Sequence, residues 1–299
     1  MNSRGKLIAE LILIALISTV CYSQGPDKGS APGTGIEPAL MAKANAGNPE
    51  AEFKIGTKYE LGARVAKDPS QAAAWYRKAA DKGYAPAQHS LGVLYESGTG
   101  VPLDLTAAAQ WYRQAADQGF SPAQFSLGLC YVHGKGVPQD FGQALAWYGK
   151  AAQQKNSDAL LNLAFLYHNG QGVPKDEARS FDLVRQAAEA GSADAQFQLG
   201  MDYYGGEQGL QQDNTQARQW LRRSAKQGDV AAQFNYAMLL KAQPAEVYFW
   251  LSVAAPHLTG ETKQKTAELR TTAAGHLSPA ERAQIDQQVK TWRPVEEQP

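Results

Sequence analysis

Apolar positions recur along this chain at two spacings, one within helices and one between longer segments. Ala87, Leu91 and Tyr95 follow one another at four-residue intervals, so they fall on one side of a predicted α-helix. Segment 83–118 aligns with segment 119–154 without a gap, and the same residue types return at matching positions. Self-similarity at a fixed period in this range indicates a solenoid of stacked helical units.

Each repeated segment carries the signals of two antiparallel helices. Gly98 lies just past the first helix, where a left-handed conformation favours glycine. Asp104 precedes the second helix and can cap it by accepting backbone N–H bonds. In that second helix Trp111 stands with Ala115 and Ala116, a combination that lets helices approach closely while the indole fills the space between units. Each unit is therefore predicted to be a helix–turn–helix.

The repeats form an array with atypical ends. We predict an all-α, right-handed superhelical solenoid of about six units, closed by capping helices. Residues 36–46 are expected to form the N-terminal capping helix, and residues 256–299 the C-terminal capping helices and tail, in which Ser278 and Glu281 fit a helix start. The predicted solenoid covers 47–255, in units 47–82, 83–118, 119–154, 155–190, 191–227 and 228–255.

The beginning of the chain has the three-part pattern of a secretory signal. A short positive start is followed by an apolar core at 11–20 and then by small residues. We expect a signal peptide at 1–23, a flexible Gly/Pro/Ser linker at 24–35, and no stable membrane span after cleavage. The expected location is exported, with the periplasm favoured. Secretion, a lipid anchor on Cys21 and a retained membrane anchor are the alternatives.

Charge and cysteine content further limit the class of partner and the chemistry expected of this protein. Lysine plus arginine and aspartate plus glutamate both total 29, so the formal net charge is zero. This balance argues against nucleic acid as a partner, since such proteins usually concentrate a basic excess on one face. Cys130 takes the position of Leu94 and Leu166 in neighbouring units, so it is predicted to be a small buried apolar residue. The basic residues expected to form a solvated convex stripe on the second helices are Arg77, Lys78, Arg113, Lys150, Arg222 and Arg223.

The repeated pattern AxxxLGxxYxxGxGVxxDxxxAxxWYxxAA resembles the Sel-1-like repeat, a relative of the tetratricopeptide repeat. The resemblance extends from residue 47 to about 255 and keeps one register through five units. It implies a right-handed superhelix that acts as an adaptor for other proteins, often in signalling or in the cell envelope. Local departures are Arg64 at a loop glycine, Leu183 at the tryptophan of unit four, and Leu240 at the tyrosine of unit six.

The free side of the first helices is the predicted partner-binding surface, because a solenoid offers its concave face to ligands. The predicted partner-binding residues are a polar ladder of Ser90, Ser126, Asn162 and Gln198, an apolar line of Val93, Leu129, Phe165 and Met201, and His133 and Asn169 one turn further. Asn235 and Met238 continue the two rows. Such a surface suits an extended or helical peptide. The alternative is that the apolar line packs internally against neighbouring first helices.

No catalytic motif accompanies the repeats. The sequence holds no GxSxG nucleophile elbow, P-loop, HExxH or CxxC motif. Of the five histidines, His133 and His168 are the pair placed to approach each other across adjacent units, but surface or groove histidines are the more ordinary interpretation. Glu60 and Glu96 are explained by repeat register rather than by acid–base catalysis. We therefore predict no enzyme activity, no cofactor and no metal.

Two functional hypotheses follow. The leading one is an exported, non-catalytic adaptor or scaffold of the bacterial cell envelope that binds a periplasmic or envelope protein or peptide through the concave face, with a role in signalling or envelope assembly. The alternative is a binder or hydrolase of peptidoglycan fragments or β-lactams, by analogy with a secreted branch of the same repeat family. That branch carries paired cysteines, whereas only Cys130 lies in the array here.

Overall fold

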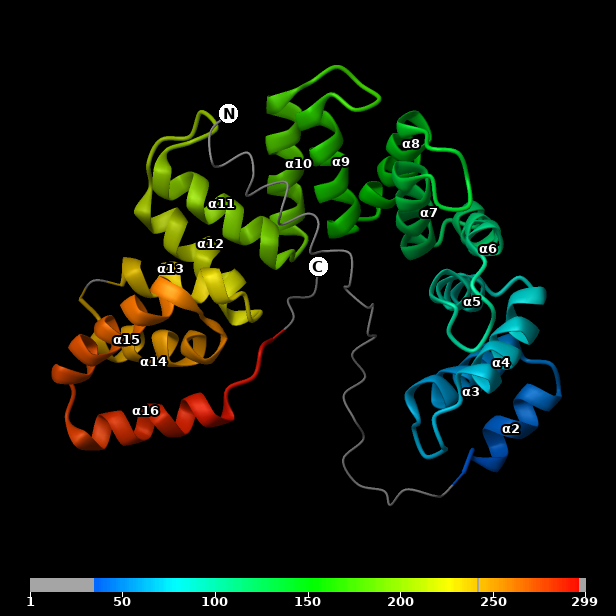
Figure 1. Ribbon diagram of the computed structural model, residues 1–299, viewed down its shortest axis with the longest axis horizontal. Helices are drawn as coiled ribbons and strands as arrows, with labels where there is room; N and C mark the ends of the chain where they lie inside the picture. The colour runs from blue at the N-terminus through cyan, green and yellow to red at the C-terminus, as the bar shows by residue number, and fades with distance from the viewer. Residues whose placement is uncertain (1–34, 241, 296–299) are drawn as a thin grey trace.

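The computed structural model describes residues 35–240 and 242–295. Over these residues the chain is a helical solenoid without strands, which confirms the predicted fold class (Figure 1). The predicted signal peptide, and the linker up to Gly35, lie outside the described residues. The elements are α2 (Pro38–Asn45), α3 (Pro49–Leu61), α4 (Pro69–Asp81), α5 (Ala85–Ser97), α6 (Leu105–Asp117), α7 (Ser121–His133), α8 (Phe141–Gln153), α9 (Ser157–Asn169), α10 (Glu177–Glu189), α11 (Ala193–Gly205), α12 (Asn214–Lys226), α13 (Val230–Leu239), α14 (Pro244–Ala254), the 3₁₀ turn η2 (Ala255–His257), α15 (Gly260–Gly275) and α16 (Pro279–Thr291).

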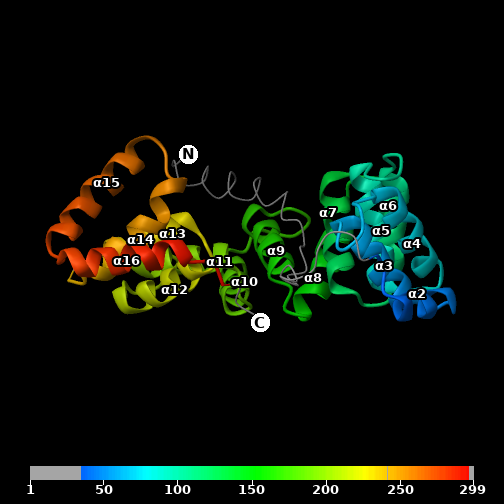
Figure 2. The same ribbon diagram turned by 90° about the horizontal axis from the view of Figure 1, so that it is seen from below.

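Each helix packs mainly on the helices that precede and follow it in the chain. The contacts run from α2 on α3, through each pair and each junction between pairs, to α14 on α15 and α16. The helices therefore trace an open arc in which α2 and α16 lie far apart (Figures 1 and 2). Because each unit contacts only its neighbours, a local change in sequence alters one junction and leaves the others intact.

The helix boundaries follow from caps in the sequence. The second helices of units one to five each begin after an aspartate whose side chain accepts a backbone N–H of the first turn, as Asp104 does from Ala107 at 2.9 Å. The first helices of these units each end at a glycine in the left-handed conformation, such as Gly98 with φ +67°. Both predictions about the caps are confirmed.

The two helices of a unit approach closely because a glycine on the first faces a tyrosine on the second. A Cβ atom at Gly92 would lie 2.6 Å from the ring of Tyr112, and one at Gly128 would lie 2.5 Å from Tyr148. These tyrosines are fully buried, so the mid-helix glycines are required by packing, which outweighs their low helix propensity. In unit four an alanine replaces the glycine and a valine replaces the tyrosine, which preserves the fit.

The loop glycines are explained by contact with the preceding unit. Gly136 has φ +69°, and a Cβ there would lie 2.0 Å from the carbonyl oxygen of Leu105, at the start of the previous unit's second helix. Unit one has no full unit before it, and its loop carries Arg64 in the same left-handed region, with φ +63°. The guanidinium of Arg64 pairs with Glu37 at 3.1 Å, just before α2. The departure at Arg64 therefore leaves the loop geometry unchanged.

The two ends of the array are covered by helices outside the repeat. At the N-terminal end, residues of α2 pack on Ala51 and Ile55 of α3. At the other end α14 contacts both α15 and α16, and Trp250 lies in an edge-to-face contact with Trp292. Ser278 and Glu281 form the capping box that begins α16.

Candidate partner-binding surfaces

The predicted partner-binding residues lie on one side of α5, α7, α9 and α11, which we call the ladder face. Most of them are half-buried, whereas His133 and Asn169 are exposed and Val93 is 39% exposed. The arrangement brings them into rows across successive first helices, as the repeat register requires. Their role in binding a partner stays a prediction.

The polar row makes local hydrogen bonds that the sequence did not reveal. Ser126 Oγ lies 3.1 Å from Nε2 of His89 on the preceding first helix, so this pair bridges two units. Asn162 and Asn169 each donate their side-chain amide to a carbonyl oxygen four residues earlier in α9, at 2.9 Å. The polar row is therefore partly satisfied within the protein, while acceptor oxygens of its amides remain available to a peptide.

The apolar row is shared between internal packing and the surface. Leu129 and Phe165 pack against the core of units three to five, and Met201 packs against the core around Trp250. Each of the three is only partly buried. The alternative of internal packing therefore applies to part of each side chain, and a role of the exposed part in binding a peptide stays a prediction.

The histidines do not form a metal site in the described structure. Nδ1 of His168 lies 2.7 Å from Glu177, which follows in the next helix. Burial and the neighbouring Lys135 lower the pKa of His133. Across residues 35–240 and 242–295 no group of three or more histidine, cysteine, aspartate or glutamate residues is arranged to hold a metal ion.

Cys130 is buried at the position predicted for a small apolar residue. Its side chain is 3% exposed and is in the thiol form, because burial raises its pKa to about 12. Such a thiol is a poor nucleophile at neutral pH. Cys130 is therefore part of the packing of units two and three.

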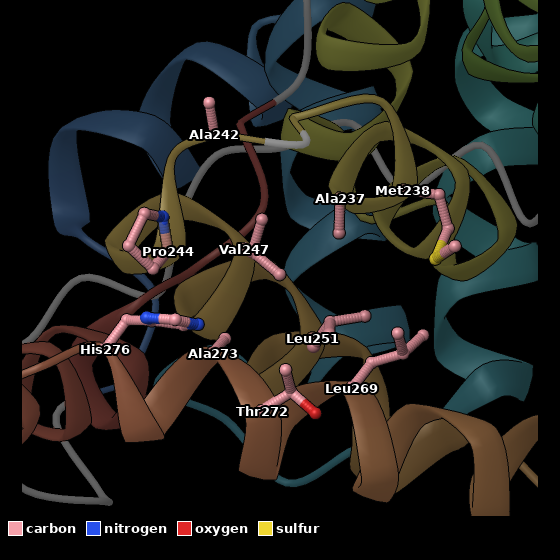
Figure 3. Close-up of a pocket in the computed structure, with 10 residues that line it drawn as sticks. All are labelled: Ala237, Met238, Ala242, Pro244, Val247, Leu251, Leu269, Thr272, Ala273 and His276. Carbon is pink, nitrogen blue, oxygen red and sulfur yellow. The ribbon is translucent and has the colours of Figure 1, made fainter.

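A cavity of about 390 Å³ lies between α13, α14 and α15, beyond the last complete unit (Figure 3). Its walls are mainly apolar, and Met238 connects it with the continuation of the apolar row on α13. The sequence gives no direct sign of this cavity, because its walls come from three helices that are separated along the chain. Its lining residues are Ala237, Met238, Ala242, Pro244, Val247, Leu251, Leu269, Thr272, Ala273 and His276.

The expectation of a solvated basic stripe on the second helices holds for the exposed Lys78, Lys150 and Arg222 and is wrong for the half-buried Arg77, Arg113 and Arg223. Arg77 is half-buried and donates a hydrogen bond to the hydroxyl of Tyr95 in the next unit. Its guanidinium carbon lies 5.5 Å from the centroid of the Tyr95 ring and 5.1 Å from that of Trp111. Arg113 makes the same contacts with Tyr131 and Trp147. These arginines join adjacent units by cation–π contacts.

A second link between units consists of buried amides. Gln88 donates its side-chain amide to the carbonyl oxygen of Ala80 in the preceding unit at 3.1 Å, and it accepts from Gln118 at 2.6 Å. Gln124 with Gln154, and Gln196 with Gln227, repeat the pattern. In unit one the pair becomes Glu52 with Lys82, 2.6 Å apart.

The junction between units three and four lacks both links. Gly149 stands where Arg77 and Arg113 stand, Leu183 replaces the tryptophan, and Leu160 replaces the buried glutamine, with Ala190 as its partner. A cavity of about 300 Å³, which we call the junction cavity, opens between α8, α9 and α10 at this place. The sequence shows each substitution, but it does not show that the substituted positions line one cavity. The lining residues are Leu145, Gly149, Ala152, Gln153, Leu160, Leu163, Tyr167, Val173, Arg179, Leu183 and Gln186.

None of the helices in residues 35–240 and 242–295 combines the length and apolarity needed to cross a membrane.

Five consecutive segments match the family model described as Sel1 repeat, at residues 49–84, 85–120, 121–156, 157–192 and 193–229. The helix pairs, their capping and their packing thus define a Sel1 repeat scaffold, and the chain belongs to the Sel1 repeat family. No curated protein matches it. Sel1 repeat proteins generally mediate protein–protein interactions.

Two solved structures show the same fold at similar sequence identity. One is a protective antigen present in uropathogenic Escherichia coli strains that displays an SLR fold, with 31% identity over 85% of this chain and a TM-score of 0.63. The chain spans 60% of the length of that antigen. The other is a Sel1 repeat protein from Oxalobacter formigenes, with 33% identity, a TM-score of 0.60, and coverage of 74% of this chain and 92% of that one.

Proposed function

We propose that this protein is an exported, non-catalytic scaffold of the bacterial cell envelope that binds a partner protein through the ladder face. The observation that carries the proposal is the row of partly exposed apolar residues beside polar ones on successive first helices. An extended or helical peptide can place apolar side chains along such a row and hydrogen-bond to the amides beside it. Export is supported by the signal-like pattern at 1–23.

The cavity between α13, α14 and α15, which we call the terminal cavity, lies where the apolar row continues onto α13. Met238 belongs both to the continuation of the apolar row and to the cavity wall. Cavities of this size with mostly apolar walls accept one large apolar side chain or a small group of them. The proposed partner is therefore a peptide segment whose apolar residues contact Val93, Phe165 and Met201 and whose last anchor enters the cavity.

The experiment is selection of peptide ligands on the full repeat array, followed by titration of variants. The double variant Phe165→Ala/Met201→Ala should weaken the selected peptide by about tenfold or more, because buried apolar anchors carry most of the binding energy. Val93→Lys should weaken it without disturbing the core, since Val93 is already 39% exposed. Leu103→Ala is the matched control, because Leu103 is 64% exposed and lies in the loop between α5 and α6, off the ladder face.

Circular dichroism and thermal unfolding of each variant separate lost binding from lost folding. Equal affinities for the wild type and both ladder variants would place binding elsewhere. Failure of the envelope fraction to yield a partner that competes with the selected peptide would contradict the envelope role. Turnover of a chromogenic β-lactam, absent in a denatured control, would support the alternative function instead.

A further inference from the structure

The junction cavity lies where an arginine and a tryptophan are found at the two preceding junctions. At those junctions the space above the first-helix tyrosine is filled by Arg77 with Trp111 and by Arg113 with Trp147. The corresponding space above Tyr167 has Gly149 and Leu183 at its edges. Since both replacements are smaller, the cavity is the volume that the arginine and the indole occupy in the other units.

The backbone around the cavity is unchanged by these replacements. α8, α9 and α10 are each 13 residues long, as are their counterparts in the preceding units. α8 and α10 begin after capping aspartates and α9 ends at a left-handed glycine, as those counterparts do, whereas α9 begins at an Asn156 side-chain cap that α5 and α7 lack. A Cβ built at Gly149 meets nothing within 4 Å, so the glycine is not required by packing. Leu183 is 1% exposed and lines the cavity without filling it.

The chemistry of the walls selects among possible occupants. Leucine side chains form the apolar part of the lining, whereas two glutamine side chains and Arg179 make a comparable part of it polar. A group with both an apolar surface and a hydrogen-bond donor therefore fits this lining. Tyr167 contributes a ring whose counterparts, Tyr95 and Tyr131, each lie beside an arginine guanidinium that also contacts a tryptophan ring. The hydroxyls of those two tyrosines accept hydrogen bonds from arginine, so the hydroxyl of Tyr167 is placed to accept one from a ligand donor.

Arg179 decides between a guanidinium and an aromatic ring as the occupant. Its side chain lines the cavity and pairs with Asp182 at 3.2 Å. A second guanidinium would be repelled by this cation, whereas an aromatic ring would be attracted to it through its face. An indole also has one N–H donor for the Tyr167 hydroxyl and enough apolar surface to cover the leucine side chains.

We propose that the junction cavity binds the tryptophan side chain of a partner peptide. The occupant supplies, from another chain, the indole that units two and three supply with Trp111 and Trp147. This site lies among α8, α9 and α10 and shares no residue with the predicted ladder. It does not depend on the ladder face, so either surface can fail its test while the other passes.

The test is ligand-observed ¹⁹F NMR of N-acetyl-5-fluorotryptophan methylamide with the full repeat array, which avoids the signals of the protein's own tryptophans. Because the probe is small, saturable binding with a Kd of about 1 mM is expected. Gly149→Arg restores the arginine of the other units over Tyr167 and should weaken binding at least tenfold. Gly149→Ala is its matched control and should keep the Kd within about twofold, since a methyl group leaves the cavity open.

Leu183→Trp and Leu103→Trp form the second matched pair. The first fills the cavity with the residue found in units two and three and should abolish probe binding. The second adds a tryptophan at a loop position that is 64% exposed and should change nothing. Phe165→Ala/Met201→Ala should also leave probe binding intact, which separates this site from the ladder face.

Four results would overturn the proposal. They are absence of saturable binding up to about 20 mM, unchanged affinity in Gly149→Arg, binding of N-acetyl-arginine methylamide at least as tightly as the tryptophan probe, or equal binding of N-acetyl-leucine methylamide. The arginine result would assign the cavity to a guanidinium. Equal binding of the leucine amide would show that the cavity accepts apolar groups without selectivity.

Discussion

The hydroxyl of Tyr112 donates a 2.8 Å hydrogen bond to the carboxylate of Glu96 on the first helix of the same unit. Burial alone would raise the pKa of Glu96, but hydrogen bonds from Lys135 and Tyr112 outweigh it and hold the pKa below its usual range. In unit three Val132 stands at the glutamate position. The hydroxyl of the equivalent Tyr148 is fully buried and has no hydrogen-bond partner in the described structure.

These two tyrosines should respond in opposite ways to loss of the hydroxyl. Tyr112→Phe removes a hydrogen bond to a charged group and should lower the free energy of unfolding by about 2 kcal/mol. Tyr148→Phe removes a buried hydroxyl without a partner and should leave stability unchanged or raise it by up to about 1 kcal/mol. Denaturant unfolding of the two variants provides the comparison. Equal losses would show that Tyr148 has a partner in solution.

His89 should make the array less stable in mild acid. Burial lowers the pKa of His89 from its ordinary value of 6.5 to about 4, and Glu96 opposes this only partly. Between these two pH values the unfolded chain binds a proton that the folded chain does not, so stability rises with pH through this window. At about pH 5 the loss relative to neutral pH is about 2 kcal/mol.

The matched variant for this effect is His89→Phe, because units one, three, five and six carry phenylalanine at this position. It keeps the aromatic packing on Tyr112 and Phe120 and loses only the bond to Ser126. The stability of the variant relative to the wild type should therefore be greater at about pH 5 than at about pH 7, by about 2 kcal/mol, because groups such as Asp202 titrate equally in both proteins. A difference between the two proteins that does not change with pH would contradict the role of His89.

Asp202 should affect the pH dependence of stability in the direction opposite to His89, because it favours the folded state at lower pH. It stands where units two and four carry leucine, is 6% exposed, and has one carboxylate oxygen without a partner in the described structure. Burial, with a smaller contribution from Glu207, raises its pKa to about 7. From its ordinary pKa up to about 7 the folded chain binds more protons than the unfolded one, so stability falls as pH rises.

Asp202→Leu should raise the free energy of unfolding, and the gain should be larger at about pH 8 than at about pH 5. The difference is of order 3 kcal/mol, since one pKa unit corresponds to about 1.4 kcal/mol. Asp202→Asn provides the control, because it removes the charge while keeping the polar burial. Unfolding curves at the two pH values test the prediction, and a gain independent of pH would indicate packing rather than ionisation.

The sequence predicts the helix pair because the signals for it are local. Asp104 as a cap, Gly98 in the left-handed region and the apolar spacing of Leu91 and Tyr95 each act within a few residues. These signals also recur from unit to unit, so a position that is ambiguous in one unit can be interpreted from the equivalent positions in the other units.

The environment of a long polar side chain could not be predicted in this way. Arg77 lies on the outer helix and appears solvated in the sequence, but its guanidinium reaches Tyr95 and Trp111, which belong to the next unit. The junction cavity has the same origin. Gly149 and Leu183 are ordinary substitutions when taken singly, and a cavity results only because adjacent second helices bring them together.

The buried amide pairs predict a measurable coupling between residues of one unit. Gln124 donates to the carbonyl oxygen of Ala116 at 3.3 Å and accepts from Gln154 at 2.8 Å. The two positions change together along the chain, from glutamate with lysine, through glutamine pairs, to Leu160 with Ala190. Replacement of both amides by apolar residues is therefore tolerated. Replacement of only one of them leaves a buried amide or carbonyl group without a hydrogen-bond partner.

A double-mutant cycle on unit three tests this coupling. Gln124→Leu and Gln154→Ala should each lower the free energy of unfolding by about 1–2 kcal/mol. The double variant reproduces the pair found in unit four, so its loss should fall short of the sum by about 1 kcal/mol. Denaturant unfolding followed by two probes gives the four values and checks that the transition remains cooperative. Additive losses would show that the amide pair stabilises the array only through independent bonds to the backbone.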